Sequence, residues 1–157
     1  ASILHRGQAW LFSGHSGMGK STHTALWHEY AGTPYLNGDL NLIGKREEGD
    51  GYCIYGIPWC GTSGLCTTET IELGGIILLE RDEEDHVEEL SPFEQVLRVT
   101  QRMISPAWTE QMATGNLEFA EQMAEQTWIT QLFCTKNPSA VEVIRKWIDE
   151  KNEEIEA

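Results

Sequence analysis

The chain has 157 residues, of which 40% are hydrophobic and 23% charged, and these values are typical of one globular domain. Its net charge of −14 argues against nucleic-acid binding, because affinity for a phosphate backbone comes from Lys and Arg. No apolar run approaches the roughly 20 residues that a bilayer span requires, and the first residues do not resemble a signal peptide.

The amino-terminal half predicts strands around a glycine-rich loop. A helical pattern covers residues 21–30 and is ended by Gly32 and Pro34. A charged, glycine-containing turn at residues 44–51 predicts a hairpin. The strands of this half are predicted at residues 2–4, 8–12, 40–43 and 52–55, with extended structure at residues 35–37.

The carboxyl-terminal half predicts strands alternating with helices, after a loop rich in Gly, Thr and Ser at residues 56–68. Ser91 and Glu94 have capping-box spacing with Pro92 between them, so a helix is expected from there to about Met103. The other elements are predicted as a buried strand at 75–80, a helix at 118–126, a strand at 128–134 and an amphipathic helix from 137 to 148.

One motif carries chemistry. The string GHSGMGKS at residues 14–21 fits G-x-x-x-x-G-K-[ST] and lies between a predicted strand and a predicted helix. In this motif backbone N–H groups surround nucleotide phosphates, the lysine reaches the terminal phosphates, and the hydroxyl binds Mg²⁺. The predicted nucleotide-binding residues are Gly14, His15, Ser16, Gly17, Met18, Gly19, Lys20, Ser21 and Thr22.

A second Mg²⁺ ligand is needed, because this hard cation takes oxygen ligands. Asp39 follows an extended segment 19 residues after Lys20 and is the natural candidate. The predicted metal ligands are therefore Ser21 and Asp39, and the predicted catalytic residues are Lys20 and Asp39. Arg81, Arg98 and Arg102 could also stabilise transition-state charge, but the sequence does not choose among them.

The strings SGHSGMGKST (13–22), LNGD (36–39) and GIPWCG (56–61) resemble the catalytic domain of HPr kinase/phosphorylase-related proteins. That family shares its P-loop core with phosphoenolpyruvate carboxykinases. The resemblance implies a single α/β P-loop domain, with helices packed on a mixed sheet. It also implies ATP-dependent phosphorylation of a hydroxyl. Gly38 stands where relatives usually carry the first of two adjacent acids, and the His that they tend to carry ahead of residues 1–4 falls outside this chain.

These observations predict a P-loop kinase that uses ATP and Mg²⁺. The phosphate acceptor is a serine or another hydroxyl on a protein, a peptide or a small molecule. Two alternatives stay open: a noncatalytic nucleotide-binding regulatory module, and a small-molecule kinase similar to shikimate kinase, although the hairpin after Asp39 disfavours the latter. The oligomeric state is also open, a homo-oligomer included.

The kinase-like domain is predicted at residues 1–148, followed by an acidic tail at 149–157. Acidic runs at 80–89 and in this tail are interpreted as solvated surface. The four cysteines show no zinc-site spacing and are predicted to be reduced thiols, which together with ATP use favours the cytoplasm.

Overall fold

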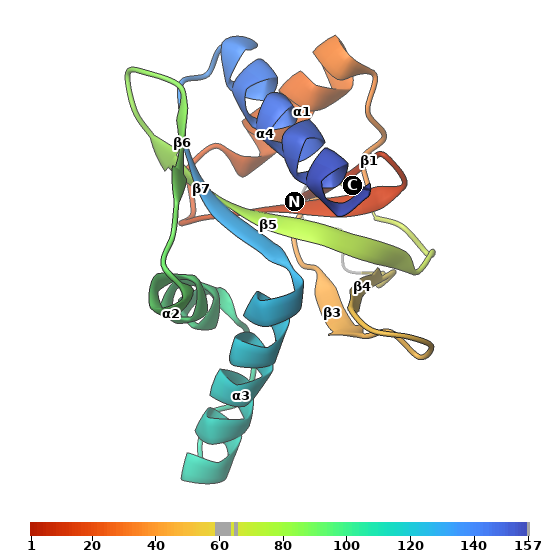
Figure 1. Cartoon of the computed structure of the whole chain (residues 1–157), viewed down its shortest axis with the longest axis vertical. Helices are drawn as coiled ribbons and strands as arrows, with labels where there is room; N and C mark the ends of the chain where they lie inside the picture. The colour runs from red at the N-terminus through yellow and green to blue at the C-terminus, as the bar shows by residue number, and fades with distance from the viewer. Residues whose placement is uncertain (59–63, 65, 157) are drawn as a thin grey trace.

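Strand β5 (Ile71–Arg81) is the centre of a seven-stranded mixed sheet (Figure 1). The computed structural model describes residues 1–58, 64 and 66–156. Strand β2 (Gln8–Ser13) runs parallel to β5 on one side, and β7 (Trp128–Cys134) runs parallel to it on the other. The buried run from Ile76 to Leu79 therefore lies between two parallel neighbours, as its continuous apolar sequence indicates.

Four shorter strands complete the sheet. β1 (Ser2–His5) pairs antiparallel with β2, and β6 (His86–Glu89) pairs antiparallel with β7. β3 (Leu42–Lys45) and β4 (Tyr52–Tyr55) form a hairpin, of which β4 pairs antiparallel with the first residues of β5. The sheet is therefore mixed, as the sequence predicts.

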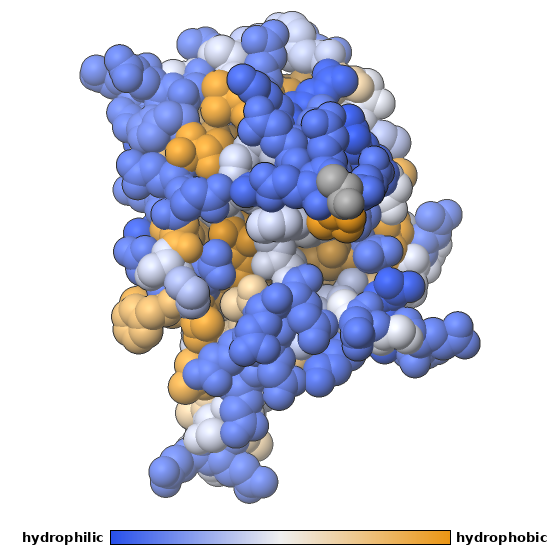
Figure 2. Space-filling view, viewed as in Figure 1, coloured by the Kyte–Doolittle hydropathy of each residue, from blue (hydrophilic) through white to orange (hydrophobic). Residues whose placement is uncertain are grey.

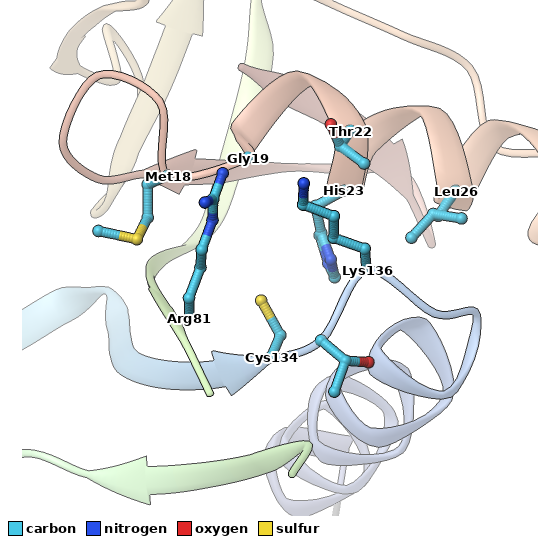
Figure 3. A pocket seen from close by; sticks show the side chains of 9 residues that line it. Met18, Gly19, Thr22, His23, Leu26, Arg81, Cys134 and Lys136 are labelled. Carbon is cyan, nitrogen blue, oxygen red and sulfur yellow. The ribbon is translucent and has the colours of Figure 1, made fainter. Parts of the chain in front are cut away.

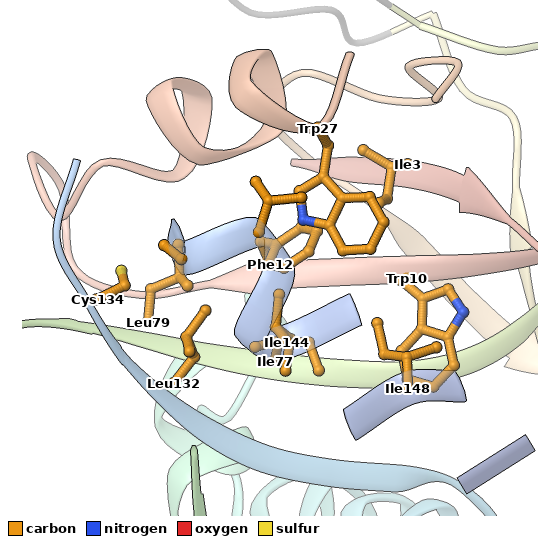
Figure 4. Close-up of a cluster of buried hydrophobic side chains, with 12 residues drawn as sticks. Ile3, Trp10, Phe12, Trp27, Ile77, Leu79, Leu132, Cys134, Ile144 and Ile148 are labelled. Carbon is orange, nitrogen blue, oxygen red and sulfur yellow. The ribbon is translucent and has the colours of Figure 1, made fainter. Parts of the chain in front are cut away.

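Helices lie on both faces of the sheet, and one of the four, α3, projects away from it (Figure 1). α1 (Lys20–Ala31) and α4 (Ser139–Glu156) lie on one face, over a core that includes Trp10, Phe12 and Trp27 (Figure 4). α2 (Pro92–Arg102) and α3 (Glu110–Gln126) belong to the other face, where a second core contains Val99 and Met123. The described residues thus form one α/β domain with a three-layer arrangement.

Several predicted boundaries differ from the structure. β6 is a strand that the sequence does not predict: its acids Glu88 and Glu89 are exposed, as expected for solvated surface, but the segment also pairs with β7 at the edge of the sheet. α3 begins eight residues before its predicted start, where the Thr109 side chain accepts a hydrogen bond from the Met112 amide. α4 continues to Glu156, past the predicted end, and Asp149 on it pairs with His5 and Arg6 at 3.0 and 2.9 Å. The Ser91–Glu94 capping box is confirmed.

The described cysteines differ in whether they form a disulfide. Cys53 and Cys134 are buried free thiols, whereas Cys66 is disulfide-bonded. The prediction of reduced thiols is therefore wrong for Cys66, and for Cys60 it lies outside the described residues.

Hydrophobic side chains are exposed on α2, on α3 and between them. Phe93, Ile104 and Trp108 are 74%, 83% and 86% exposed. Figure 2 shows hydrophobic residues at the surface over α2 and beside α3, on a face that is otherwise largely hydrophilic. None of the helices in the described part of the chain has the length and apolar character of a membrane span.

His23 is a buried histidine on α1 whose titration should appear in the stability of the protein. Its Nε2 accepts a hydrogen bond from Trp27 Nε1 at 3.0 Å, so Nδ1 carries the proton of the neutral ring. Nδ1 has no partner among the described residues. Burial lowers the pKa of His23 from 6.5 to about 4, because the charged ring would lose its hydration.

We therefore expect the free energy of unfolding to fall as the pH drops from about 6.5 to about 4. In that window the unfolded chain protonates this histidine and the folded chain does not, a difference of about 3 kcal/mol. Urea unfolding at pH 7 and pH 4 should show this component in wild type and in His86→Gln, whose histidine is exposed, but not in His23→Gln. Equal pH dependence in all three proteins would contradict it.

Candidate functional site

The loop of residues 14–19 joins the end of β2 to the start of α1, which confirms the predicted order of strand, glycine-rich loop and helix. Gly17 and Gly19 have φ angles of 79° and 99°. These lie in the left-handed region, which residues other than glycine rarely adopt. Gly19 is the N-cap of α1, and no side chain caps this end of the helix. The first turn of α1 also contains no acid, so its N–H groups and positive dipole end are not offset by a carboxylate there.

Lys20 reaches back across the loop. Its Nζ donates hydrogen bonds to the carbonyl oxygens of Gly14 at 2.9 Å and His15 at 3.1 Å. The ammonium group is therefore held next to the loop backbone, where it could also meet phosphate oxygens. Ser21 and Thr22 follow it on the first turn of α1, and both are exposed.

Asp39 is exposed and lies two residues after Asn37, whose carbonyl oxygen accepts a hydrogen bond from the Ser2 amide of β1. The Ala1 amino group lies near the end of β2, because it donates a hydrogen bond to the carbonyl oxygen of Phe12, one residue before that end. Burial and the charge of Lys20 lower the pKa of that amino group and the charge of Asp39 raises it, which together bring the pKa to about 5. Lys20 and Asp39 thus both lie near one point at the end of β2.

Asn37 fixes the segment that carries Asp39. Its amide and carbonyl bond to Ser2, its side-chain nitrogen donates to Asn41, and its side-chain oxygen accepts from the Thr67 amide at 3.0 Å. Asn37 is fully buried, so it is a structural tie between β1 and two loops rather than an exposed turn residue.

Two arginines contact the loop from other elements. Arg81, the last residue of β5, donates from Nη2 to the Gly17 carbonyl oxygen at 2.5 Å. Arg102, at the end of α2, places Nη1 and Nη2 at 3.1 and 2.6 Å from the two ring nitrogens of His15. Because a neutral imidazole has one acceptor nitrogen, Arg102 donates to one of them at a time.

Two hollows flank the loop. The larger holds about 150 Å³ between the loop, the end of β5 and α2. The smaller lies between α1 and the segment that follows β7 (Figure 3). The larger hollow is lined by Gly14, His15 and Met18, by Leu78, Leu79 and Glu80, by Arg98, Gln101 and Arg102, and by Gln131. Arg81 and Lys136 are among the residues that line the smaller one.

Positive charge is concentrated at this loop although the chain is acidic overall. Of the 11 Lys and Arg residues, five lie around it, namely Lys20, Arg81, Arg98, Arg102 and Lys136. None of these five is within 4.0 Å of a described carboxylate oxygen. Four of the other six basic residues do lie within 4.0 Å of a carboxylate oxygen, namely Arg6, Arg46, Lys146 and Lys151. The bases around the loop are therefore available to an anionic ligand.

The described residues contain no cluster of three or more His, Cys, Asp or Glu that could hold a metal ion alone. A cation bound here would have to share its ligands with phosphate oxygens and water, as Mg²⁺ does in nucleotide sites. Ser21 and Asp39 supply the hydroxyl and the carboxylate for such a site, and they stay a prediction.

Sequence reasoning missed Glu80 and Gln131, which line the larger hollow. The signal for Glu80 was present, because an acid directly follows the buried run from Ile76 to Leu79. Glu80 was not singled out, because the whole acidic run 80–89 was interpreted as solvated surface. Residues 59–63 lie outside the described residues, so a site wall formed by loop 56–63 stays a prediction.

A scan against protein-family models and searches of curated proteins and of solved structures found no match to this chain.

Proposed function

We propose that this protein binds Mg²⁺-ATP at the loop of residues 14–19 and transfers the γ-phosphoryl group to a hydroxyl, as an HPr kinase-related P-loop kinase. One observation carries the proposal. The glycine-rich loop leads into an uncapped helix N-terminus without acids, and unpaired basic side chains surround it. This arrangement suits a polyanion such as a nucleoside triphosphate.

The chain would perform this reaction mainly by positioning and electrostatics. Backbone amides of the loop and the Lys20 ammonium would hold the β- and γ-phosphates. Ser21 and Asp39 would hold Mg²⁺, which when bound offsets charge on the phosphate oxygens. Arg81 and Arg102 already contact the loop and are placed to add positive charge near the transferred group.

Two features support the kinase over its alternatives. The β3–β4 hairpin follows Asp39, where a shikimate-kinase-like chain would continue with a helix. The 150 Å³ hollow beside the loop offers room for an acceptor, which a module that only binds nucleotide does not need. The acceptor is a hydroxyl on a protein, a peptide or a small molecule. ATP use places the reaction in the cytoplasm, although a disulfide such as that of Cys66 is unusual there.

Calorimetric titration with ATP, with and without Mg²⁺, tests the binding half of this proposal, and release of ADP tests turnover. Binding without any ADP release would favour the noncatalytic module. Absence of ATP binding by the folded wild-type chain would overturn both.

Asp39→Asn should weaken ATP binding in Mg²⁺ by roughly tenfold or more and leave metal-free ATP binding within about twofold. The substitution keeps the size of the side chain but removes the charge that a hard dication needs. Titration with and without Mg²⁺ measures the difference, and Asp50→Asn is the control, because Asp50 is exposed in the turn between β3 and β4. Equal losses in the two conditions would make Asp39 a structural residue.

A further inference from the structure

Glu80 lies directly beside the phosphate-binding loop. β5 pairs in parallel with β2, and Leu78 is opposite Ser13, the last residue of β2. The two backbone segments stay close beyond the end of β2, since a Cβ added to Gly14 would lie 3.2 Å from the Leu79 carbonyl oxygen. The next residue of β5 is Glu80, and it lines the larger hollow together with Gly14 and His15.

The Glu80 carboxylate is held by one oxygen only. Its Oε2 accepts a hydrogen bond from Gln131 Nε2 at 2.7 Å. Gln131 is on β7 and is 2% exposed, so its side chain is a fixed support. Among the described residues, Oε1 has no hydrogen-bond donor, and no basic group lies within 4.0 Å of either oxygen.

Two other carboxylates in the region of β5 to β6, those of Asp85 and Glu89, are occupied. Asp85 accepts from the Thr135 amide, the Thr135 hydroxyl and the Ser139 hydroxyl, and so fixes the start of α4. Glu89 accepts from Trp147 and pairs with Lys151. Glu80 differs from both, because one of its oxygens is anchored while the other is free to take a proton.

The wall opposite Glu80 is basic. Arg98, Gln101 and Arg102 are three and four residues apart on α2, so they share one helix face, and all three line the hollow. A carboxylate next to nucleotide phosphates would repel them, and the two guanidinium groups offset this repulsion. Leu78 and Leu79 supply apolar lining to the hollow, and Glu80 itself is exposed to solvent.

We infer that Glu80 is the catalytic base for the acceptor hydroxyl, which enters the hollow between the loop and α2. This inference rests on the proposed kinase function. In the reaction, Glu80 Oε1 takes the proton of the hydroxyl while the hydroxyl oxygen bonds to the γ-phosphorus. The bond between that phosphorus and the β–γ bridging oxygen breaks, and ADP leaves with its electron pair. Asp39 follows Asn37, which is bonded to β1, and Glu80 is on β5, so metal binding and proton transfer are assigned to segments on opposite sides of β2.

Glu80→Gln tests the assignment with water as the acceptor. The amide oxygen of Gln can still accept from Gln131, so the fold should be preserved, but the side chain cannot take the proton. We expect phosphate release from Mg²⁺-ATP to slow by about 10² to 10⁴, the range for loss of a general base. ATP affinity and the Mg²⁺ concentration for half-maximal rate should stay within about twofold of wild type. Glu72→Gln is the matched control, because Glu72 is near the other end of the same strand, paired with Arg46 at 3.6 Å.

The possible results distinguish failure of the Glu80 assignment from failure of the proposed kinase function. A Glu80→Gln protein that releases phosphate at the wild-type rate overturns the assignment, and so does a shifted Mg²⁺ requirement, which would make Glu80 a metal ligand. A wild-type chain that binds ATP but releases no phosphate also overturns it, while ATP binding at the loop stands. Failure of wild type to bind ATP is a different result, because it removes the proposed function itself.

Discussion

Lys20→Ala should lower the affinity for ATP by roughly 10- to 100-fold and abolish measurable turnover, while the protein stays folded. The ammonium group bonds to the Gly14 and His15 carbonyl oxygens at the loop, and a phosphate ligand would gain charge-assisted hydrogen bonds from it. Lys20 is not part of either hydrophobic core, so its removal should cost no more than about 1 kcal/mol of stability. Calorimetric titration with ATP measures the affinity, and thermal unfolding measures the fold.

Lys146→Ala is the control for this experiment. Lys146 is a lysine on α4 whose side chain is 80% exposed and pairs with Glu150, so removing it changes net charge equally but leaves the loop intact. We expect ATP affinity within about twofold of wild type for this variant. Unchanged affinity in Lys20→Ala would remove the loop as the phosphate site, and equal losses in both variants would indicate a general effect of charge.

Trp10→Ala should destabilise the protein by about 3 to 5 kcal/mol, a large part of the stability of an ordinary domain. Trp10 is fully buried on β2, between the sheet and α4 (Figure 4). Its ring fills the space above Gly74 and Gly75, where an added Cβ would lie within 2.7 Å and 2.5 Å of ring carbons. Alanine would leave a cavity there, because the backbone of three neighbouring strands cannot collapse into it.

Trp108→Ala provides the comparison for the same residue type. Trp108 is 86% exposed, so its removal should change the free energy of unfolding by no more than about 0.5 kcal/mol. Urea unfolding followed by circular dichroism measures both variants without relying on tryptophan fluorescence. A similar loss in the two proteins would contradict the buried position of Trp10.

Local patterns were sufficient for the elements whose signal lies within one segment. The loop of residues 14–19 was recognisable, because its glycines, lysine and serine stand at fixed spacing and Gly17 and Gly19 adopt φ angles that favour glycine. The start of α2 was equally clear, since Ser91 and Glu94 cap it within four residues. Backbone geometry and capping act over a few bonds, so the sequence alone determines them.

Edge strands and helix starts were harder to predict. β6 has too few apolar residues to indicate a strand, and it exists because Val87 and its neighbours pair with β7. The first turns of α3 are almost entirely exposed and therefore lack the apolar periodicity that marked residues 118–126.

The surroundings of the loop were decided by tertiary structure. Ser13 meets Leu78 across parallel strands, and Arg102 meets His15 across 87 residues, so Glu80, Gln131 and the basic face of α2 come together only in the folded chain. By itself the sequence determined a glycine-rich loop of defined geometry between a strand and a helix. Which carboxylate and which bases stand beside that loop depended on strand order and helix packing, because these join residues that no local spacing relates.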